Sequence, residues 1–356
     1  MARQSFDFID WMKAIGMALI VVGHVAGAMV NTLTPPIYPK QLGVAFFLFA
    51  MGFSLAGDSR PRWNVVGSRL FEVYLFGLAA AIALTAIGYV TSGALNASNY
   101  LPLLGGANVV VNNFPVNPTT WYIGTYLHFL LLWALVFRNR PITPAMLAGS
   151  IAFEIVVRAL LVGTLGAFVG YMMVPNWITV FLAGMWYGRQ RDDDRSWALP
   201  KPLIAMVILA AGWAAIVPSF VAERSIPFMR IGHGPAPLTL LVTSACVSFL
   251  YLSYTWLVFR ITSCVKAPAM IRLVARNTVI IFIAHMPLYY LLDARLGAWT
   301  SSRPLQVIIR LAVCFGALVF VSEGIRRIVR PKELRDRIFA RTPRAVAVQP
   351  ERAVAM

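Results

Sequence analysis

Three ionisable side chains, Asp10, Lys13 and His24, interrupt the first long apolar stretch of the chain. In an α-helix each residue turns by about 100°, so Lys13 and His24, eleven residues apart, point within about 20° of each other. Asp10 lies about 60° from Lys13, and His24 lies about 16 Å further along the helix axis than Lys13. Because ionisable groups are costly inside a bilayer, this stripe predicts a helix face that borders the protein interior or a water-filled cavity.

The stripe has two interpretations. Imidazole titrates near neutral pH, so His24 could act as a general base or acid. Alternatively, His24 is a buried histidine that hydrogen-bonds to a neighbouring helix, and Asp10 and Lys13 form an i,i+3 ion pair at the cytoplasmic edge. The residues alone do not decide between a catalytic and a structural role.

The composition indicates the surroundings of this stripe. The chain has 356 residues, of which 59% are hydrophobic and 13% are charged, whereas soluble domains carry about 25% charged residues. This excludes an ordinary soluble globular protein, a disordered chain and a coiled coil. The three cysteines have no C-x-x-C spacing, and no His-x-x-x-His pair or carboxylate cluster suggests a metal site. Neither a disulfide framework nor a metal site is therefore expected.

Ten stretches are close to the roughly 17–25 mostly apolar residues that a membrane-spanning helix needs. They lie near 9–30, 42–57, 70–92, 121–137, 142–163, 167–188, 203–222, 237–259, 277–292 and 305–324. We therefore expect an all-α, polytopic integral membrane protein with about ten transmembrane helices in a single domain, 1–325. Pro175 and Pro287, inside the sixth and ninth stretches, predict a kink or a break in each helix.

Lysine and arginine are unevenly distributed between the predicted loops. The even-numbered loops and the two termini carry 23 of them, and the odd-numbered loops carry 5. By the positive-inside rule, both termini are expected in the cytoplasm and the protein in the inner (plasma) membrane. The net charge of +17 is partly concentrated in a tail, 326–356, that holds nine of the 31 basic residues. Such a tail beside a membrane helix predicts binding of anionic lipid, and no nucleic-acid partner is expected.

The first stretch carries a motif that matches a known pattern. Asp10-x-x-Lys13-Ala-Ile, followed by an apolar run that ends in Val-Val-Gly-His24, resembles the first helix of the membrane acyltransferase family 3 proteins. The similarity is greatest to the branch named after fucose 4-O-acetylase, which favours Asp-x-x-Lys. The family's basic residue and histidine correspond to Lys13 and His24.

Weaker resemblances to the same family extend over about residues 4–325. The segment 46–53 is similar to the second-helix pattern F-F-x-x-S-G-F, with Met51 in place of serine, and Arg69-Leu70 resembles the basic start of the third helix. Val73 stands where that helix often has proline. Trp121-Tyr122-Ile123 resembles the aromatic opening of a middle helix, and His285-Met286-Pro287 resembles a late H-x-P motif.

The resemblance implies an O-acyltransferase of the cell envelope. Such an enzyme moves an acyl group, usually acetyl from cytoplasmic acetyl-CoA, to a hydroxyl of a glycan or glycolipid. His24 would then be the catalytic base or acid, with Asp10 and Lys13 in support. Acyl-CoA would be a co-substrate, and no tightly bound cofactor is implied. Three arginines at the cytoplasmic edge would attract the phosphates of CoA, although topology alone also explains them; they are Arg60, Arg62 and Arg69.

Further residues are candidates for the acceptor site. His285 is predicted at a depth that could meet His24. Three aromatic residues, Tyr74, Trp121 and Tyr122, could line a sugar site, although aromatic side chains are common at membrane interfaces. His128 reads as a packed histidine, and Glu154 and Arg158 as an i,i+4 pair that neutralises itself within its helix.

A second function fits the same features. Broken helices and intramembrane charges also occur in secondary transporters, so the alternative is a transporter or flippase for a glycolipid or a small metabolite.

Overall fold

The structure, a computed structural model, describes residues 6–25, 39–93, 103–111, 117–190, 200–220 and 237–339. Within these ranges the chain forms helices and turns, and no strand. The α-helices are α1 (Asp7–Val25), α3 (Pro39–Ala56), α4 (Arg62–Ser92), α6 (Trp121–Leu132), α7 (Pro144–Leu165), α8 (Ala167–Met172), α9 (Ile178–Gln190), α10 (Pro200–Phe220), α11 (Pro237–Ser263), α12 (Ala269–Trp299), α13 (Arg303–Leu311), α14 (Leu318–Val329) and α15 (Pro331–Phe339). The 3₁₀ and π segments are η2 (Ala107–Val109), η3 (Pro118–Thr120), η4 (Trp133–Phe137), η5 (Val174–Asn176) and η6 (Ala312–Ala317).

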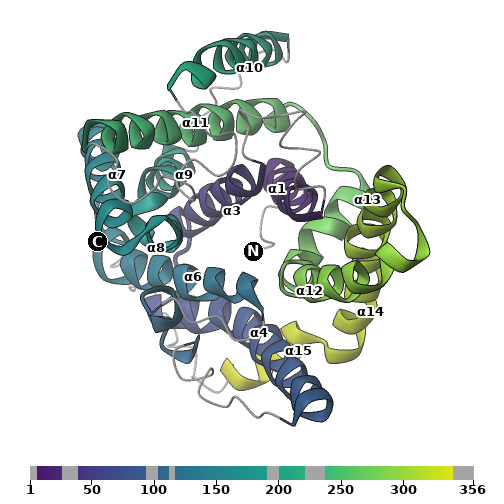
Figure 1. Cartoon of the computed structure of the whole chain (residues 1–356). Coiled ribbons are helices and arrows are strands. Elements are labelled where there is room, and N and C mark those ends of the chain that lie inside the picture. The colour runs from purple at the N-terminus through teal and green to yellow at the C-terminus, as the bar shows by residue number, and fades with distance from the viewer. Residues whose placement is uncertain are drawn as a thin grey trace, which may run out of the picture.

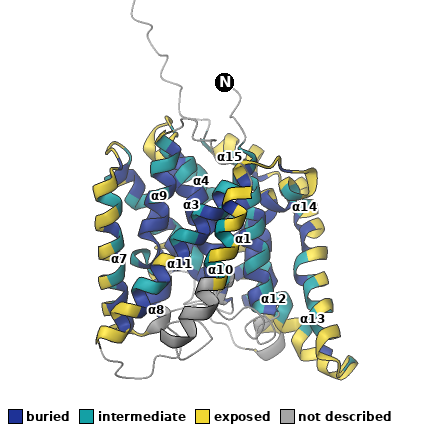
Figure 2. Ribbon diagram, turned by 90° about the horizontal axis from the view of Figure 1, so that it is seen from above, coloured by how far each residue is buried: buried dark blue, intermediate teal, exposed yellow. Residues whose placement is uncertain are grey.

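The helices form a bundle with α1 and α3 inside it (Figure 1). In the view of Figure 2, turned by 90°, the axes of most helices lie roughly parallel to one another, and α15 lies at one end of the bundle. We call this the α15 end. Large apolar side chains are exposed on the outer helices, for example Leu160 on α7 and Ile204 and Val207 on α10. A lipid-facing surface requires such side chains, because lipid tails offer no partner for polar groups.

Glycines allow α1 to pack closely against α3. A Cβ atom added to Gly16 would lie 2.9 Å from the carbonyl oxygen of Gly43, and one added to Gly43 would clash with the carbonyl oxygen of Gly16. The two backbones therefore touch, as at small-residue helix interfaces in membranes. This contact fixes the rotation of α1 and so the direction of its polar stripe.

Six described helical segments are long and apolar enough to cross a membrane, judged by length and composition. They are Asp7–Val25, Arg62–Ile87, Pro144–Leu165, Pro237–Ser263, Ala269–Trp299 and Arg303–Phe339, and the shorter apolar helices are Lys40–Ala56, Trp121–Phe137 and Pro200–Ala211. The chain is thus an all-α, multi-pass membrane protein, but six rather than ten described helices reach full spanning length. The count of ten and the cytoplasmic termini stay predictions, and residues 340–356 of the basic tail lie outside the described ranges.

The two prolines behave differently. At Pro175 the chain breaks as expected: α8 ends at Met172, and α9 begins at Ile178 after a 3₁₀ turn. At Pro287 the helix is not broken, because α12 continues through it to Trp299, and a kink there stays a prediction. Proline cannot donate to the carbonyl four residues earlier, which is that of Ile283. The buried Asn117 replaces this donor, with its Nδ2 2.7 Å from the Ile283 oxygen, so the helix continues.

Candidate functional site

Two histidines from distant helices meet inside the bundle. His24 lies near the end of α1, and His285 lies in the middle of α12. Nδ1 of His24 is 3.0 Å from Nε2 of His285, and the ring centroids are 5.1 Å apart. His285 is fully buried and His24 is half-buried.

The hydrogen bonds of this pair determine where its protons lie. Nδ1 of His285 is 3.1 Å from the carbonyl oxygen of Ile281, which can only accept, so this nitrogen carries the proton. In neutral His285 the other nitrogen, Nε2, is then an acceptor, and His24 must donate from its Nδ1. Nε2 of neutral His24 is left with a free lone pair. The arrangement therefore presents one imidazole as a base and uses the other to orient it.

A lysine that the sequence analysis did not select approaches the same pair. Lys40 is half-buried at the start of α3, and its aliphatic stem packs against Gly23, which precedes His24. Its charge is close enough to act on the imidazole of His24. In sequence Lys40 was only a lone charge in an exterior loop, so the contact with Gly23 was needed to identify it.

A polar cavity of about 980 Å³ opens at the α15 end of the bundle; we call it the larger cavity. Asp10 and Lys13 line it from α1, as the stripe predicts. The basic residues of its lining are Lys13, Arg60, Arg69, Arg276, Arg326 and Arg335, and the acidic ones are Asp10, Asp58 and Glu72. Basic side chains therefore predominate in this cavity.

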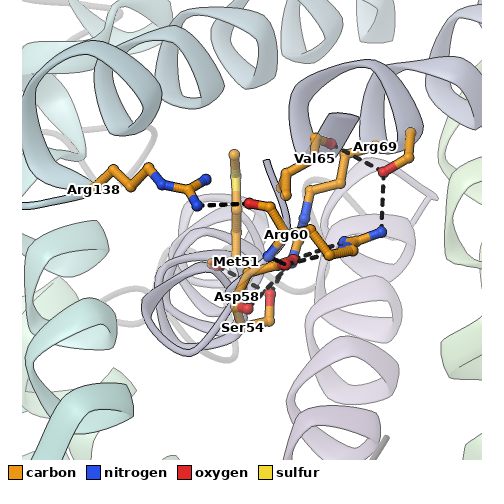
Figure 3. Close-up of polar contacts among 8 residues, drawn as sticks. Met51, Ser54, Asp58, Arg60, Val65, Arg69 and Arg138 are labelled. Atoms are coloured by element: carbon orange, nitrogen blue, oxygen red, sulfur yellow. Dashed lines mark hydrogen bonds and ion pairs between the residues drawn. The ribbon is translucent and has the colours of Figure 1, made fainter. Parts of the chain in front are cut away.

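An ion-pair cluster between α3 and α4 holds two of these arginines (Figure 3). Arg60 forms two hydrogen bonds to the carboxylate of Asp58, at 2.7 and 2.9 Å, and Arg69 lies 3.8 Å from it. Arg69 also donates to Oγ of Ser54 at 3.0 Å, and Arg138 donates to the carbonyl oxygen of Arg60 at 2.6 Å. The two arginines are fixed at the cavity wall.

The charges of this cluster shift the ionisation of its carboxylate. Burial raises the pKa of Asp58, but hydrogen bonds from Arg60 and the charges of Arg60 and Arg69 outweigh this, so the pKa lies below its ordinary value. The hydrogen bond to Asp58 raises the pKa of the Arg60 guanidinium. Both groups are therefore charged near neutral pH.

A second cavity of about 150 Å³, the smaller cavity, adjoins the larger one. Both are lined by Lys13, Ser54 and Arg69, but the rest of the smaller cavity is mostly apolar. Tyr122, one of the aromatic candidates for the acceptor site, lines it.

The smaller cavity comes within one helical turn of the histidine pair along α12. Phe282 is one of its lining residues, and His285 lies three positions further on, which corresponds to about 4.5 Å along the helix axis. The ring of Phe282 lies 5.1 Å from that of Tyr122 and 5.9 Å from that of His285. Neither His24 nor His285 is in the described lining of either cavity, and Phe282 is the lining residue whose ring contacts the ring of His285.

Three predicted site residues lie elsewhere. Arg62 donates to the carbonyl oxygen of Ala134 at 3.3 Å, so it binds η4 and is not in the described lining of either cavity. The hydroxyl of Tyr74 donates to the carbonyl oxygens of Leu103 and Leu104. Trp121 is buried against Tyr171 and Tyr122. None of the three is in the described lining of either cavity, because each side chain contacts a neighbouring helix or turn instead.

Three basic residues of the larger cavity were missed. Arg276, Arg326 and Arg335 come from α12, α14 and α15. In sequence Arg276 counted only as a positive-inside charge, and Arg326 and Arg335 belonged to the basic tail that was expected to bind anionic lipid. Glu72 of α4, an acidic residue of the same cavity, forms an ion pair with Arg326. Only the folding of the C-terminal helices against α4 brings these groups together.

The predicted pair of Glu154 and Arg158 is confirmed, and it belongs to a separate structural network. Both side chains are fully buried in α7 and form an ion pair. Arg158 also donates to Oγ of Ser248 at 2.8 Å and to the carbonyl oxygen of Asn176 at 2.8 Å. The backbone N–H of Thr179 donates to Glu154 at 3.1 Å, so the network joins α7, η5, α9 and α11, and it lines neither cavity among the described residues. Among all the residues that the structure describes, no three His, Cys, Asp or Glu side chains gather where a metal ion could bind.

Comparison with known proteins finds one match. The sequence model of acyltransferase family 3, described as an acyltransferase domain, matches residues 6–322. No curated protein and no solved structure matches the chain. The matched region contains the histidine pair and the smaller cavity, and it ends before Arg326 and Arg335.

Proposed function

The chain belongs to acyltransferase family 3 and is a membrane acyltransferase, and on this premise we propose that it moves an acetyl group from cytoplasmic acetyl-CoA to a hydroxyl of a glycan or glycolipid. The observation that carries the proposal is the hydrogen bond between His24 and His285, which leaves Nε2 of His24 free to accept a proton.

In the proposed reaction His24 is the general base. Its Nε2 removes the proton of the acceptor hydroxyl while the hydroxyl oxygen attacks the carbonyl carbon of the thioester. An ester C–O bond forms and the thioester C–S bond breaks. The proton passes from His24 to the departing sulfur, so the products are the acetylated acceptor and coenzyme A with a free thiol.

The larger cavity suits the nucleotide end of the donor. With the α15 end in the cytoplasm, as the distribution of charge predicts, acetyl-CoA would enter this cavity. Arg60 and Arg69 are fixed by Asp58 and Ser54, and guanidinium groups bind phosphate with paired hydrogen bonds. Asp10 and Lys13 line the same cavity, and Lys13 also lines the smaller one. Lys13 is therefore placed to meet the polar part of the donor where the two cavities join.

The smaller cavity supports a short acyl group. Its volume is about 150 Å³, and a liquid water molecule occupies about 30 Å³. This space suits an acetyl thioester better than a long fatty acyl chain. Tyr122, the cavity's predicted acceptor-site aromatic, would here contact the donor or the acyl group.

The acceptor would approach from the other side of the Phe282 ring. His24 lies at the end of α1 remote from Asp10, and the positive charge of Lys40 acts on it from α3. A cation beside the base would stabilise the oxyanion that forms when the thioester is attacked. Phe282, which lines the smaller cavity and contacts His285, would turn aside to let the thioester reach His24 and would otherwise keep water from the donor.

The test is the transfer of label from radiolabelled acetyl-CoA. Membranes that contain the native protein should place label in alkali-labile esters of the glycolipid or polysaccharide fraction and release free CoA. His24→Ala should abolish both, whereas His128→Gln, a histidine of α6 outside both described linings, should not. Uptake of a glycolipid into proteoliposomes without consumption of thioester would instead support the transporter and refute the proposal.

A further inference from the structure

The C-terminal helix continues the larger cavity beyond the matched family domain. The match ends at residue 322, whereas Arg326 on α14 and Arg335 on α15 both line the cavity. Together they supply two of its six basic side chains. The part of the chain after the family domain is therefore built into the wall of the cavity.

A sharp turn directs α15 back over the cavity. Arg330 has a φ of 46°, which ends α14 in the left-handed region, and Pro331 then begins α15. Proline cannot continue the preceding helix, so the chain changes direction here. The turn allows the next helix to fold back toward α4.

Aromatic packing holds α15 in this position. A Cβ atom added to Gly67 of α4 would lie 2.8 Å from Cε1 of Phe339, so the Phe339 ring packs directly on the bare backbone of that glycine. The same ring lies edge-on to Phe71, at 6.2 Å between centroids. A second tie is the ion pair between Arg326 and Glu72. Arg335, between these two contacts, is thereby aimed at the cavity.

The geometry leaves Arg335 available to an anion. Its side chain is 28% exposed, and within the described residues its ion-pair partner is its helix neighbour Asp336, which is 55% exposed. Such a surface pair contributes little, so a phosphate can replace it. Arg276 reaches the same cavity from α12 and is 53% exposed.

We infer that α15 is part of the donor site and that Arg335, together with Arg326, binds phosphate groups of the acyl-CoA. The inference rests on the proposed function, since it assigns these residues to the same donor. The chemistry required is that of a nucleotide with several phosphates, which arginines bind with paired, charge-assisted hydrogen bonds. The C-terminal helix then contributes to donor affinity although it lies outside the family domain.

The test measures the Kd of coenzyme A for the full-length protein by calorimetry. Arg335→Gln should raise the Kd about tenfold, as expected for the loss of a charge-assisted hydrogen bond. The matched control is Arg337→Gln, an exposed arginine of the same helix outside the described lining, and it should bind as the native protein does. Phe339→Ala keeps every arginine but releases α15 from α4, and it should also raise the Kd. Equal melting temperatures show that the variants are folded.

Three outcomes would overturn the inference. If native protein binds coenzyme A and the variants at positions 335 and 337 bind equally well, α15 is not part of the donor site, and the proposed function stands. If native protein does not bind coenzyme A, the proposed donor fails as well. The titrations are repeated in nanodiscs of phosphatidylcholine with and without phosphatidylglycerol. A difference between the two variants that occurs only with phosphatidylglycerol would assign Arg335 to the lipid headgroup.

Discussion

The hydrogen bond between the two histidines gives a prediction for His285. His285→Leu removes the acceptor that lies 3.0 Å from Nδ1 of His24, so the imidazole of His24 loses the side-chain contact that orients it and keeps only its backbone contact with Ile20 among the described residues. Leaving a buried polar group without its partner costs about 1–3 kcal/mol. With about 1.36 kcal/mol for each factor of ten in rate, kcat should fall by about 5- to 150-fold.

The KM for acetyl-CoA should not change in this variant. His285 is not in the described lining of either cavity, so it acts through His24 and not on the donor. His285→Gln is the matched variant, because its side-chain oxygen can accept the proton of His24 as Nε2 of His285 does. We expect it to recover most of the lost kcat.

The assay is steady-state release of CoA by purified protein with acceptor present, with kcat and KM determined separately. Equal kcat for native protein and His285→Leu would refute the orienting role. So would a folded His285→Leu protein in which only the KM for acetyl-CoA rises, because His285 would then contact the donor. A glutamine variant as slow as the leucine variant would also contradict the tautomer argument.

Three further changes have measurable outcomes. Phe282→Ala removes the ring that lines the smaller cavity and contacts His285, so hydrolysis of acetyl-CoA without acceptor should rise several-fold. Unchanged hydrolysis would show that the ring does not keep water from the thioester. Glu154→Gln leaves Arg158 buried without its counter-charge and should cost about 3–5 kcal/mol, seen as a lower melting temperature in detergent, and native-like melting would contradict it. The lowered pKa of Asp58 means that its stabilising contribution is present above its unfolded pKa, about 3.9, and is lost as pH falls through the folded value. Asp58→Asn should therefore melt earlier than native protein at neutral pH, and this difference should disappear in acid.

Helical periodicity was sufficient to predict the stripe on α1. Asp10 and Lys13 line the larger cavity, and His24 hydrogen-bonds to His285, as their common face required. The reason is that a single helix has a fixed geometry, so residues on one face stay on one face. The cost of a buried charge then predicts that this face is turned inward. The contact between His24 and His285 was predicted from the similar depth of the two residues in the bilayer.

The sequence did not determine how the other helices are rotated. Tyr74 and Trp121 carry suitable chemistry, but each is turned toward a neighbouring helix or turn and not the cavity. Arg62 reaches the carbonyl of Ala134 for the same reason. Helix rotation depends on contacts such as Gly16 with Gly43, which join separate parts of the chain.

Long-range contacts also explain two features that local rules could not predict. The helix α12 continues past Pro287 because Asn117, far away in sequence, donates to the carbonyl of Ile283, which Pro287 leaves without its usual donor. Arg335 belongs to the larger cavity because Phe339 packs on Gly67. In each case one side chain from a distant segment decides the local structure.

The most direct test of the catalytic role of His24 is a single-turnover experiment with purified protein, radiolabelled acetyl-CoA and the acceptor fraction. Native protein and His128→Gln should both form labelled ester, whereas His24→Ala, folded by melting temperature and still binding coenzyme A, should form none above background. Ester formation at the native rate by folded His24→Ala protein would contradict the account.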